Sequence, residues 1–450
     1  MEGGSEGGGG RKPLGTARML AYSLGSLGAS VPGQAFSAYA VFFYVDVLKL
    51  PALWVATIGM TLYGIWNAFN DPMLGYLSDR TRTRWGRRIP WIAGGLLPLV
   101  VFFILVWTPP ALAPGGLFAY FLVIIFLYDF FFTLVVLNWT SLFPEMFPSL
   151  RERAVVSAWR QIFGNLGLVV GVALAPMLYS NIGWAKTGIV LGLLTGAALG
   201  VSLLGSREDP SLPTEPLSLG PALRYTLANR SFLTFVFTSL TVQFAFTVLL
   251  AALRFYTKYV LHLGDEQHTI MLVACFVMVF ILLHPWGRIT VRLGARKTMM
   301  LGIAIFGITL VPAWFVSDFI GGVVFAALLG VGLPALLLLL DVLISDVIDE
   351  DELRSGTRRE GMYFGVHALF IRLGISFNGL VMGTVLTATG YDPHLAVQPA
   401  SAIWGLRFLM GGVPLVALAI AFACMVLYPL YGKRLAEVKA EIARRRAAGA

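Results

Sequence analysis

One carboxylate in this sequence stands where a carboxylate is costly. Asp71 follows the almost wholly apolar stretch 54–69, and a charged side chain in such a helix must face a polar cavity, a partner or an ion. The stretch 80–88 then contains five arginines, and short arginine-rich loops stay on the cytoplasmic side of a membrane. Asp71 is therefore either a structural acid in a salt bridge between helices or, in the interpretation that we favour, part of a coupling-ion site.

The residues around Asp71 form a long motif. It reads Asn70-Asp71-Pro72, Gly75, Asp79-Arg80-Thr81, Arg84-Trp85-Gly86-Arg87 and Pro90-Trp91. This motif resembles the helix-2 signature of the glycoside, pentoside and hexuronide (melibiose-permease-like) cation symporters, a branch of the major facilitator superfamily. The resemblance implies an all-α integral membrane protein with twelve transmembrane helices in two six-helix lobes, which transports a small molecule together with H⁺ or Na⁺.

The composition places the chain in a membrane independently of that motif. Of its 450 residues 57% are hydrophobic and 13% are charged, and the mean hydropathy is +0.78, whereas soluble domains carry about 25% charged residues. The net charge of +9 lies in short segments between apolar runs, so it indicates membrane orientation and not a nucleic-acid surface. Cys275 and Cys424 each stand alone in an apolar run, which predicts neither a disulfide nor a metal site. We expect no cofactor.

Apolar segments of about 20 residues predict membrane crossings. We expect twelve, over residues 17–48, 53–79, 90–108, 116–142, 153–179, 184–204, 230–261, 267–290, 298–315, 320–348, 362–390 and 402–430. The predicted organisation is a flexible tail (1–16), a first lobe (17–204), a linker (205–229), a second lobe (230–430) and a basic tail (431–450). Basic residues gather in alternate loops, on one side of the membrane, and the other side has little beyond Lys49 and Lys186, so both termini are predicted to be cytoplasmic. We expect a monomer in the plasma or inner membrane, surrounded by lipid, with its site between the lobes.

The resemblance also implies a cation site. It places the cation-binding residues at Asn67, Asn70, Asp71 and Thr133, and such oxygen ligands suit a hard cation. The family commonly has a second aspartate at the position of Asn67. With one carboxylate, the site favours a proton over sodium, although both remain open.

Two arginines accompany Asp71 in the membrane. At about 1.5 Å of rise per residue, Asp71, Arg160 and Arg372 lie about 12, 10 and 15 Å from the cytoplasmic ends of their helices. An isolated membrane arginine can extend its charged end to the membrane surface. Three charges of both signs at similar depths instead indicate one functional layer.

The substrate is less well defined. By resemblance, Arg160 is the substrate-binding arginine of helix 5, but the other sugar-binding positions of the family fall on Ala29-Ser30, Val136 and Thr140. Sugars need several fixed hydrogen-bond partners and an aromatic platform. The candidates are Gln34, Tyr39, Trp139, Arg160, Gln161, Tyr256 and Arg372, with Asp129 and Asp341 as further interior acids, and Gln34, Asp129 and Asp341 can equally serve only interhelical hydrogen bonds.

Three functions remain open at this point. A sugar or glycoside symporter fits the motif, while a carrier of lysolipids or other amphiphiles fits an apolar site with one arginine for a phosphate group. A membrane-embedded enzyme finds little support, because the five histidines lack metal-ligand spacing and no Gly-x-Ser-x-Gly or phosphate-binding loop occurs. A receptor without transport activity also remains possible.

A charged loop predicts a cytoplasmic gate. The segment 346–361 alternates acidic and basic residues and resembles the family's loop between helices 10 and 11. Such charges can exchange salt bridges between lobes, although a merely solvated loop is the alternative. The predicted gating residues are Asp79, Arg80, Arg153, Asp346, Asp349, Arg358 and Glu360.

Overall fold

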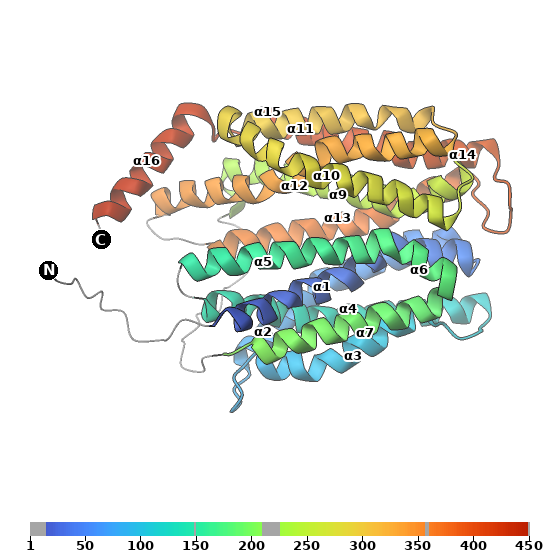
Figure 1. The fold of residues 1–450 in the computed structure, drawn as a ribbon, viewed down its shortest axis with the longest axis horizontal. Coiled ribbons are helices and arrows are strands. Elements are labelled where there is room, and N and C mark those ends of the chain that lie inside the picture. Colours follow the sequence, from blue (N-terminus) through green and yellow to red (C-terminus); the bar gives the residue numbers. More distant parts are fainter. Residues whose placement is uncertain (1–14, 148–149, 209–225, 356–359, 449–450) are drawn as a thin grey trace.

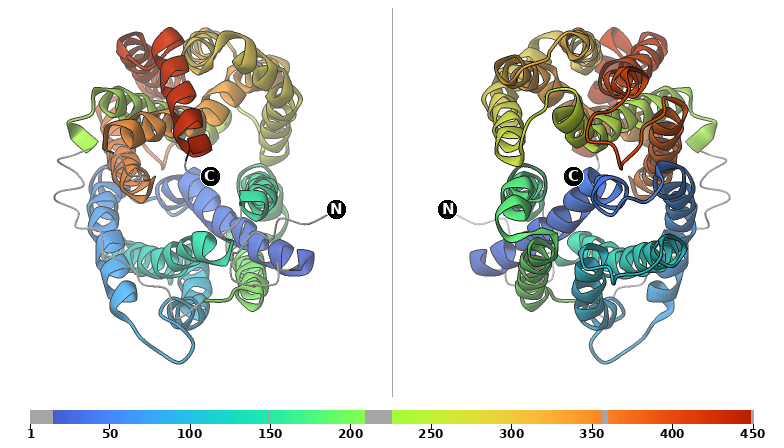
Figure 2. Two further views of the ribbon diagram at one scale, coloured as in Figure 1. Left: turned by 90° about the vertical axis from the view of Figure 1, so that its left-hand side faces the viewer. Right: turned by 90° about the vertical axis from the view of Figure 1, so that its right-hand side faces the viewer.

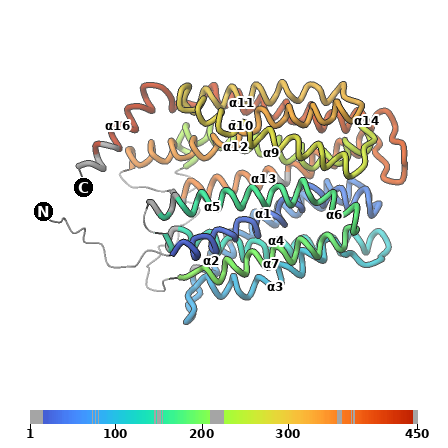
Figure 3. Tube along the Cα trace, in the orientation of Figure 1, coloured from blue at the N-terminus to red at the C-terminus, as the bar shows by residue number. Residues whose placement is uncertain are grey.

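The computed structural model describes residues 15–147, 150–208, 226–355 and 360–448. This part of the chain is helical, with one isolated bridge between Thr83 and Gly86. The helices form two bundles that lie side by side (Figure 1). Figure 3 traces the first bundle from blue to green and the second from yellow-green to red, so each bundle is one half of the chain.

The first lobe holds the helices before the linker. They are α1 (Thr16–Phe42) continued by the π-helix η1 (Phe43–Val47), the π-helix η2 (Leu53–Gly59) leading into α2 (Met60–Arg80), α3 (Ile89–Trp107), α4 (Pro114–Met146), α5 (Leu150–Leu168) continued through η3 (Val169–Leu174) into α6 (Ala175–Ile182), and α7 (Trp184–Gly205).

The second lobe repeats this arrangement. Its elements are α9 (Arg230–Tyr259), α10 (Asp265–Leu293), α11 (Ala295–Thr309) with the short η4 (Val311–Trp314), α12 (Phe319–Ser355), α13 (Glu360–Ala388), and α14 (Ala400–Arg407) continued through η5 (Phe408–Gly412) into α15 (Val413–Leu427). One more helix, α16 (Gly432–Ala448), follows the second lobe.

The apolar helices match the predicted crossings in position. Ten of the described helical segments are long and apolar enough to span a membrane. The first two predicted crossings, α1 with η1 and η2 with α2, fall outside this set, and α2 carries Asn67, Asn70 and Asp71. The described residues are therefore compatible with twelve crossings. α7 ends at Gly205 and α9 begins at Arg230, at the two ends of the predicted linker.

The predicted basic tail contains a helix, α16, which the sequence analysis did not predict. Leu435, Val438 and Ile442 recur at helical spacing, and this apolar face packs on the core while Val438 and Ile442 become buried. α16 also contacts α12. In the end-on views of Figure 2, α16 crosses the end of the second lobe towards the middle of the molecule. We call this end, at which α1 also begins, the proximal end, and the opposite end the distal end.

Glycines allow the two lobes to approach closely along α13. A Cβ atom at Gly383 would lie 2.1 Å from Oγ1 of Thr57 in η2, and one at Gly379 would lie 2.4 Å from Cβ of Met60 in α2. Any larger residue at these positions would push the helices apart. The seam between α2 and α13 therefore depends on these two glycines.

Candidate functional site

A layer of polar side chains lies between α2, α4 and α13. Asn67, Asn70 and Asp71 share one face of α2, because residues three and four apart are neighbours on a helix. On α4 the same spacing brings a second acid, Asp129, one turn before Thr133. Arg372 of α13 joins them from the other lobe, so the layer crosses the interface between the lobes.

Asp71 has a partner in each lobe. Oγ1 of Thr133 donates a hydrogen bond to Oδ1 of Asp71 over 3.0 Å, and Nη2 of Arg372 forms an ion pair with Oδ2 of Asp71. The side chains of Asp71 and Arg372 are 17% and 25% exposed. The ion pair is therefore largely removed from water, where an opposite charge is needed to stabilise the carboxylate.

A second carboxylate belongs to the same layer. Asp129 is 1% exposed and accepts hydrogen bonds from Nδ2 of Asn67 at 2.5 Å and from Nδ2 of Asn70 at 3.1 Å. Oδ1 of Asn67 in turn accepts a hydrogen bond from Nη1 of Arg372 at 2.8 Å. Asn67 thus connects Arg372 to Asp129. The sequence analysis predicted one carboxylate at this site, and the structure places a second one, from α4, beside Asn67 and Asn70.

The structure brings the four predicted cation-binding residues into one cluster, namely Asn67, Asn70, Asp71 and Thr133. Arg372, which we predicted to bind substrate, makes its described contacts in this cluster. The sequence analysis named Asp129 only as an interior acid. Its signal was its position four residues before Thr133 in an apolar helix, which puts both side chains on the same helix face.

Arg160 of α5 lies among aromatic rings. Its guanidinium carbon is 4.8 Å from the centre of the Trp139 ring and 4.9 Å from that of Phe143. Tyr22 stacks on Trp139 at 5.2 Å, and its hydroxyl donates to the carbonyl oxygen of Trp139. Nε of Arg160 is buried without a hydrogen-bond partner, and within the described ranges no carboxylate forms an ion pair with Arg160. The aromatic faces stabilise the cation, and its binding of a solute stays a prediction.

The expected layer of three charges is thus divided. Asp71 and Arg372 form an ion pair, whereas the described contacts of Arg160 are with Trp139 and Phe143. Sequence depth alone does not distinguish these arrangements, because the faces on which the side chains lie also decide which of them meet.

The other predicted substrate residues lie in different surroundings. Gln161 follows Arg160 on α5 and is exposed. Gln34 is half-buried on α1 and faces Gly171, where an added Cβ atom would lie 3.3 Å from the Cβ of Gln34. Tyr256 is fully buried in the second lobe and donates to the carbonyl oxygen of Ala313. Trp139 is therefore the predicted residue that contacts Arg160, whereas the described hydrogen bond of Tyr256 lies within the second lobe.

The acidic end of α12 binds the C-terminal helix of its own lobe. Nζ of Lys439 lies 2.9 Å from Oδ1 of Asp346, and Glu350 pairs with Arg434 and, at 2.8 Å, with Arg354. The sequence analysis predicted that Asp346 exchanges salt bridges between the lobes. In this structure Asp346 instead pairs with Lys439 of α16, on the same side of the interface, and the sequence analysis did not predict this partner.

The remaining gating predictions stay predictions. Arg80 is exposed at the end of α2, and Asp349 is half-buried. Arg358 and the side chains of Asp79, Arg153 and Glu360 lie outside the described residues.

A second contact between the lobes lies at the distal end. Asp46 of η1 is 1% exposed and accepts from Lys258, from the hydroxyl of Tyr259, and from the hydroxyl of Tyr391 at 2.7 Å. All three donors belong to the second lobe. Lys49 also donates to the carbonyl oxygen of Pro393. Sequence analysis missed this cluster, although an acid at the end of an apolar helix is a detectable signal.

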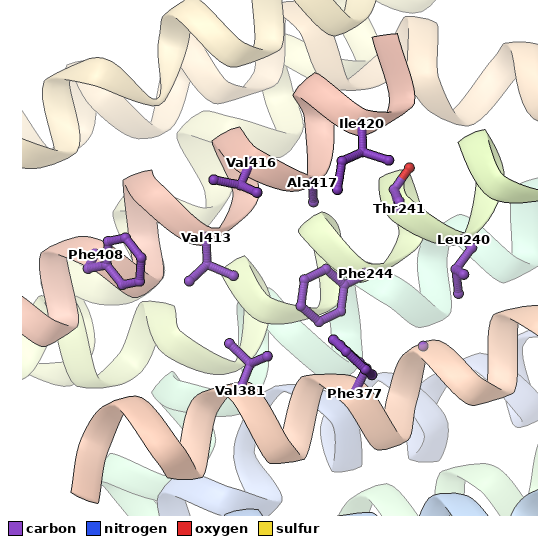
Figure 4. Close-up of a pocket in the computed structure, with 11 residues that line it drawn as sticks. Leu240, Thr241, Phe244, Phe377, Val381, Phe408, Val413, Val416, Ala417 and Ile420 are labelled. Atoms are coloured by element: carbon purple, nitrogen blue, oxygen red, sulfur yellow. The ribbon is translucent and has the colours of Figure 1, made fainter. Parts of the chain in front are cut away.

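A cavity of about 420 Å³ lies within the second lobe, between α9, α13 and the segment η5–α15 (Figure 4). Its lining is apolar apart from Thr241 and consists of Leu240, Thr241, Phe244, Gly374, Phe377, Val381, Phe408, Val413, Val416, Ala417 and Ile420. None of the predicted site residues lines it. This cavity therefore offers no charged group to orient a polar solute, and the hydroxyl of Thr241 already donates to carbonyl oxygens of its own helix.

Two helical lobes with buried charges at their interface define a multi-pass membrane transporter of the major facilitator type, and not an enzyme. The chain matches the family described as "MFS/sugar transport protein" over residues 21–432 and belongs to that family. A solved structure of the nucleoside transporter NupG has a similar fold, with a TM-score of 0.68 at 13% identity over 93% of this chain and 100% of that one.

Curated relatives include transporters for different solutes. The chain is 24% identical to the isoprimeverose transporter of Lactiplantibacillus pentosus over 91% of this chain and 88% of that one. It is also 24% identical to the sodium-dependent lysophosphatidylcholine symporter 1-A of Danio rerio, over 92% and 86% of the two chains. These relatives have different substrates, so similarity to them does not identify the solute of this chain.

Proposed function

We propose that this protein is a secondary active transporter that carries a small organic solute, a sugar or glycoside, together with a cation by alternating access. The observation that carries the proposal is the ion pair between Asp71 of the first lobe and Arg372 of the second. A coupling cation that binds Asp71 competes with Arg372 for the same carboxylate. Binding of the cation therefore changes a contact between the lobes, which is what coupling to a conformational change requires.

The solute site in this proposal lies at Arg160 and Trp139. A planar guanidinium can hold two oxygen atoms at once, and an aromatic ring offers a platform for the apolar face of a sugar. Gln161 is exposed beside Arg160 and adds an amide that can donate and accept. The relative that transports isoprimeverose supports a glycoside as the solute.

A lysolipid or another anionic amphiphile is the second candidate. It is favoured by the absence of a carboxylate paired with Arg160 among the described residues, because a phosphate would neutralise that guanidinium. The relative named as a lysophosphatidylcholine symporter supports this alternative. The apolar cavity between α9, α13 and α15 belongs to the other lobe, so a tail bound there would lie apart from Arg160.

Orientation belongs to the same proposal. We infer that the proximal end faces the cytoplasm of a plasma or inner membrane, because the arginines of the stretch 80–88 and the basic helix α16 lie there. In that orientation the cluster around Asp46 closes the outer side, and the protein works as a monomer.

Uptake into proteoliposomes tests the proposal. A panel of radiolabelled glycosides and lysolipids is offered to vesicles with an inward Na⁺ gradient, with an inward proton gradient, or with neither. Accumulation of a glycoside only in the presence of a cation gradient supports the proposal. Equal uptake with and without both gradients would show a facilitator, and accumulation of lysolipids alone would establish the second candidate.

A further inference from the structure

We propose that His268 is a pH switch at the distal contact between the lobes. In this inference His268 is neutral while the distal side is closed and takes up a proton when that side opens. Acid therefore shifts the protein towards the distally open state. The inference goes beyond the proposed function and rests only on its alternating access, not on the identity of the cation or the solute.

His268 lies near the start of α10, where the second lobe meets the first. It is 1% exposed, and its ring centre lies 6.4 Å from that of Tyr39 in α1, in an edge-to-face arrangement. α10 also contacts η3 and α6 of the first lobe. Opening the distal side moves these first-lobe elements away from α10 and so brings water to the imidazole.

The hydrogen bonds of the closed state identify a neutral ring. Nδ1 of His268 lies 3.0 Å from Oγ1 of Thr257 in α9, and this hydroxyl donates its one hydrogen to the carbonyl oxygen of Arg254 at 3.1 Å. Thr257 then accepts from Nδ1–H of His268, which assigns the tautomer. Nε2 of His268 keeps a lone pair, and this buried atom has no hydrogen-bond partner.

A second proton has no favourable place in the closed state. It would create an Nε2–H donor without an acceptor in a site that water does not reach. Nη1 of Arg254 lies 3.4 Å from the Thr257 oxygen that His268 also contacts, so the new charge would stand beside a guanidinium. The carboxylate of Asp265 is already the ion-pair partner of Arg254. A buried charge without a partner is costly.

Among the described residues, the first-lobe groups that face this region are neutral. The hydroxyl of Tyr39 donates to the carbonyl oxygen of Val172 in η3. The hydroxyl of Tyr179 in α6 is buried without a hydrogen-bond partner, and η3 consists of apolar residues and glycine. None of these groups supplies the negative charge that an imidazolium needs.

The charges of the second lobe near His268 are already paired. Arg254 and Lys258 of α9 both lie over the ring of Phe42, and Lys258 forms an ion pair with Asp46 as Arg254 does with Asp265. Glu266 of α10 is exposed, and the stretch 319–340 of α12, which packs on α10, has no titratable side chain. A protonated His268 therefore has no free counter-ion among the described residues while the lobes are closed.

The sign and the size of the effect follow from linkage. An imidazole in water takes up a proton at about pH 6.5. A proton that binds the open state and not the closed state shifts the population towards the open state. The ratio of open to closed protein should therefore rise about tenfold between about pH 7.5 and 5.5.

The reactivity of a thiol at the distal seam measures this ratio. Oγ1 of Thr57 is buried against α13 near Gly383, so the thiol of Thr57→Cys reacts with a maleimide when the lobes separate. The rate is measured on purified full-length protein in which Cys275 and Cys424 are replaced. At each pH it is divided by the rate of Val397→Cys, a position 79% exposed, to correct for ionisation of the thiol. We expect this quotient to rise about tenfold from about pH 7.5 to 5.5.

Two asparagine variants make the test specific. His268→Asn keeps an amide that can donate to Thr257 but that does not titrate, and its quotient should change less than about twofold over the same range. His262→Asn changes an exposed histidine of the loop after α9, at a φ of 55° that asparagine tolerates, and should keep the full rise. Both variants retain the buried acids of the lobe interface, so titration of those acids cannot produce the difference.

Two results would overturn the switch. One is an equal rise of the quotient in His268→Asn and in the parent that carries His268. The other is a quotient in the parent that does not change with pH, which needs no variant at position 268. If His268→Asn does not purify as a folded protein, His268→Gln takes its place, and the same equality decides.

These results also separate the switch from the proposed function. A quotient that is independent of pH, in a protein that accumulates solute with a cation gradient, refutes the switch and keeps the symporter. A thiol at position 57 that reacts at neither pH, in a protein that does not accumulate solute with either gradient, refutes both.

Discussion

Asp46 should decide how long the distal side of the transporter stays closed. This carboxylate is buried and receives hydrogen bonds from Lys258, Tyr259 and Tyr391, all in the other lobe. Asp46→Asn removes the charge that Lys258 faces and leaves an amide of nearly the same size. Opening the distal side separates these groups, so the substitution destabilises the closed state and leaves the open state, in which they are hydrated, little changed.

The size of the effect follows from the burial of the partners. Breaking a buried ion pair by removing one partner costs about 3–5 kcal/mol. The side chain of Lys258 is 37% exposed, and the new amide still accepts a hydrogen bond, so we expect a loss of about 2 kcal/mol after allowing for this solvation. At 1.4 kcal/mol per factor of ten, the ratio of open to closed protein should rise about 30-fold.

The accessibility of a cysteine measures this ratio. Oγ1 of Thr57 is buried against α13 near Gly383, so Thr57→Cys introduces a thiol of similar size at the seam. The background replaces Cys275 and Cys424, and labelling uses a membrane-impermeant maleimide added from the distal side. We expect the cysteine at position 57 to react about 30-fold faster when Asp46→Asn is also present than in the Thr57→Cys protein without it.

A matched control and a contrary result define the test. Asp318→Asn removes another acid near the distal end, one that accepts from Gly321 N–H of its own lobe at 2.8 Å. With Asp318→Asn present, the cysteine at position 57 should be labelled at the same rate as in the parent, which is the Thr57→Cys protein without further substitutions. An equal labelling rate in Asp46→Asn and the parent would show that the cluster around Asp46 does not hold the lobes closed.

Three further predictions concern the solute, the coupling and the topology. Arg160→Lys should weaken solute binding by about tenfold, because an ammonium cannot reproduce the planar fork that holds two oxygens; unchanged affinity in a titration would make Arg160 structural. Asp71→Asn should abolish accumulation against a gradient but keep solute exchange, since the neutral amide removes only the charge that attracts the cation, and gradient-driven uptake equal to wild type would contradict this. Val397→Cys, at a position 79% exposed in the loop before α14, should react with an impermeant maleimide added outside intact cells, and reaction only after lysis would reverse the proposed orientation.

The membrane helices were predictable from local properties of the chain. Hydropathy depends on neighbouring residues alone, and the predicted segment 184–204 corresponds to α7 at Trp184–Gly205. The motif around Asp71 is also local, and its resemblance to the helix-2 signature of a known family predicted both the family and the cation-binding residues Asn67, Asn70 and Asp71. α16 was missed because an isolated basic helix of this length is marginal in water, and packing of Val438 and Ile442 on the second lobe supplies the stabilisation.

Only the tertiary structure decided which side chains meet across helices. Arg372 and Asn67 are separated by 305 positions in the sequence, and no local pattern states that α13 faces α2 at this depth. The same limit hid the second carboxylate, because Asp129 joins Asp71 only through the packing of α4 on α2. The sequence thus determined the family, the helices and the residues that bring charge into the membrane. The packing of the two lobes determined which of those charges form an ion pair with each other, as Asp71 and Arg372 do.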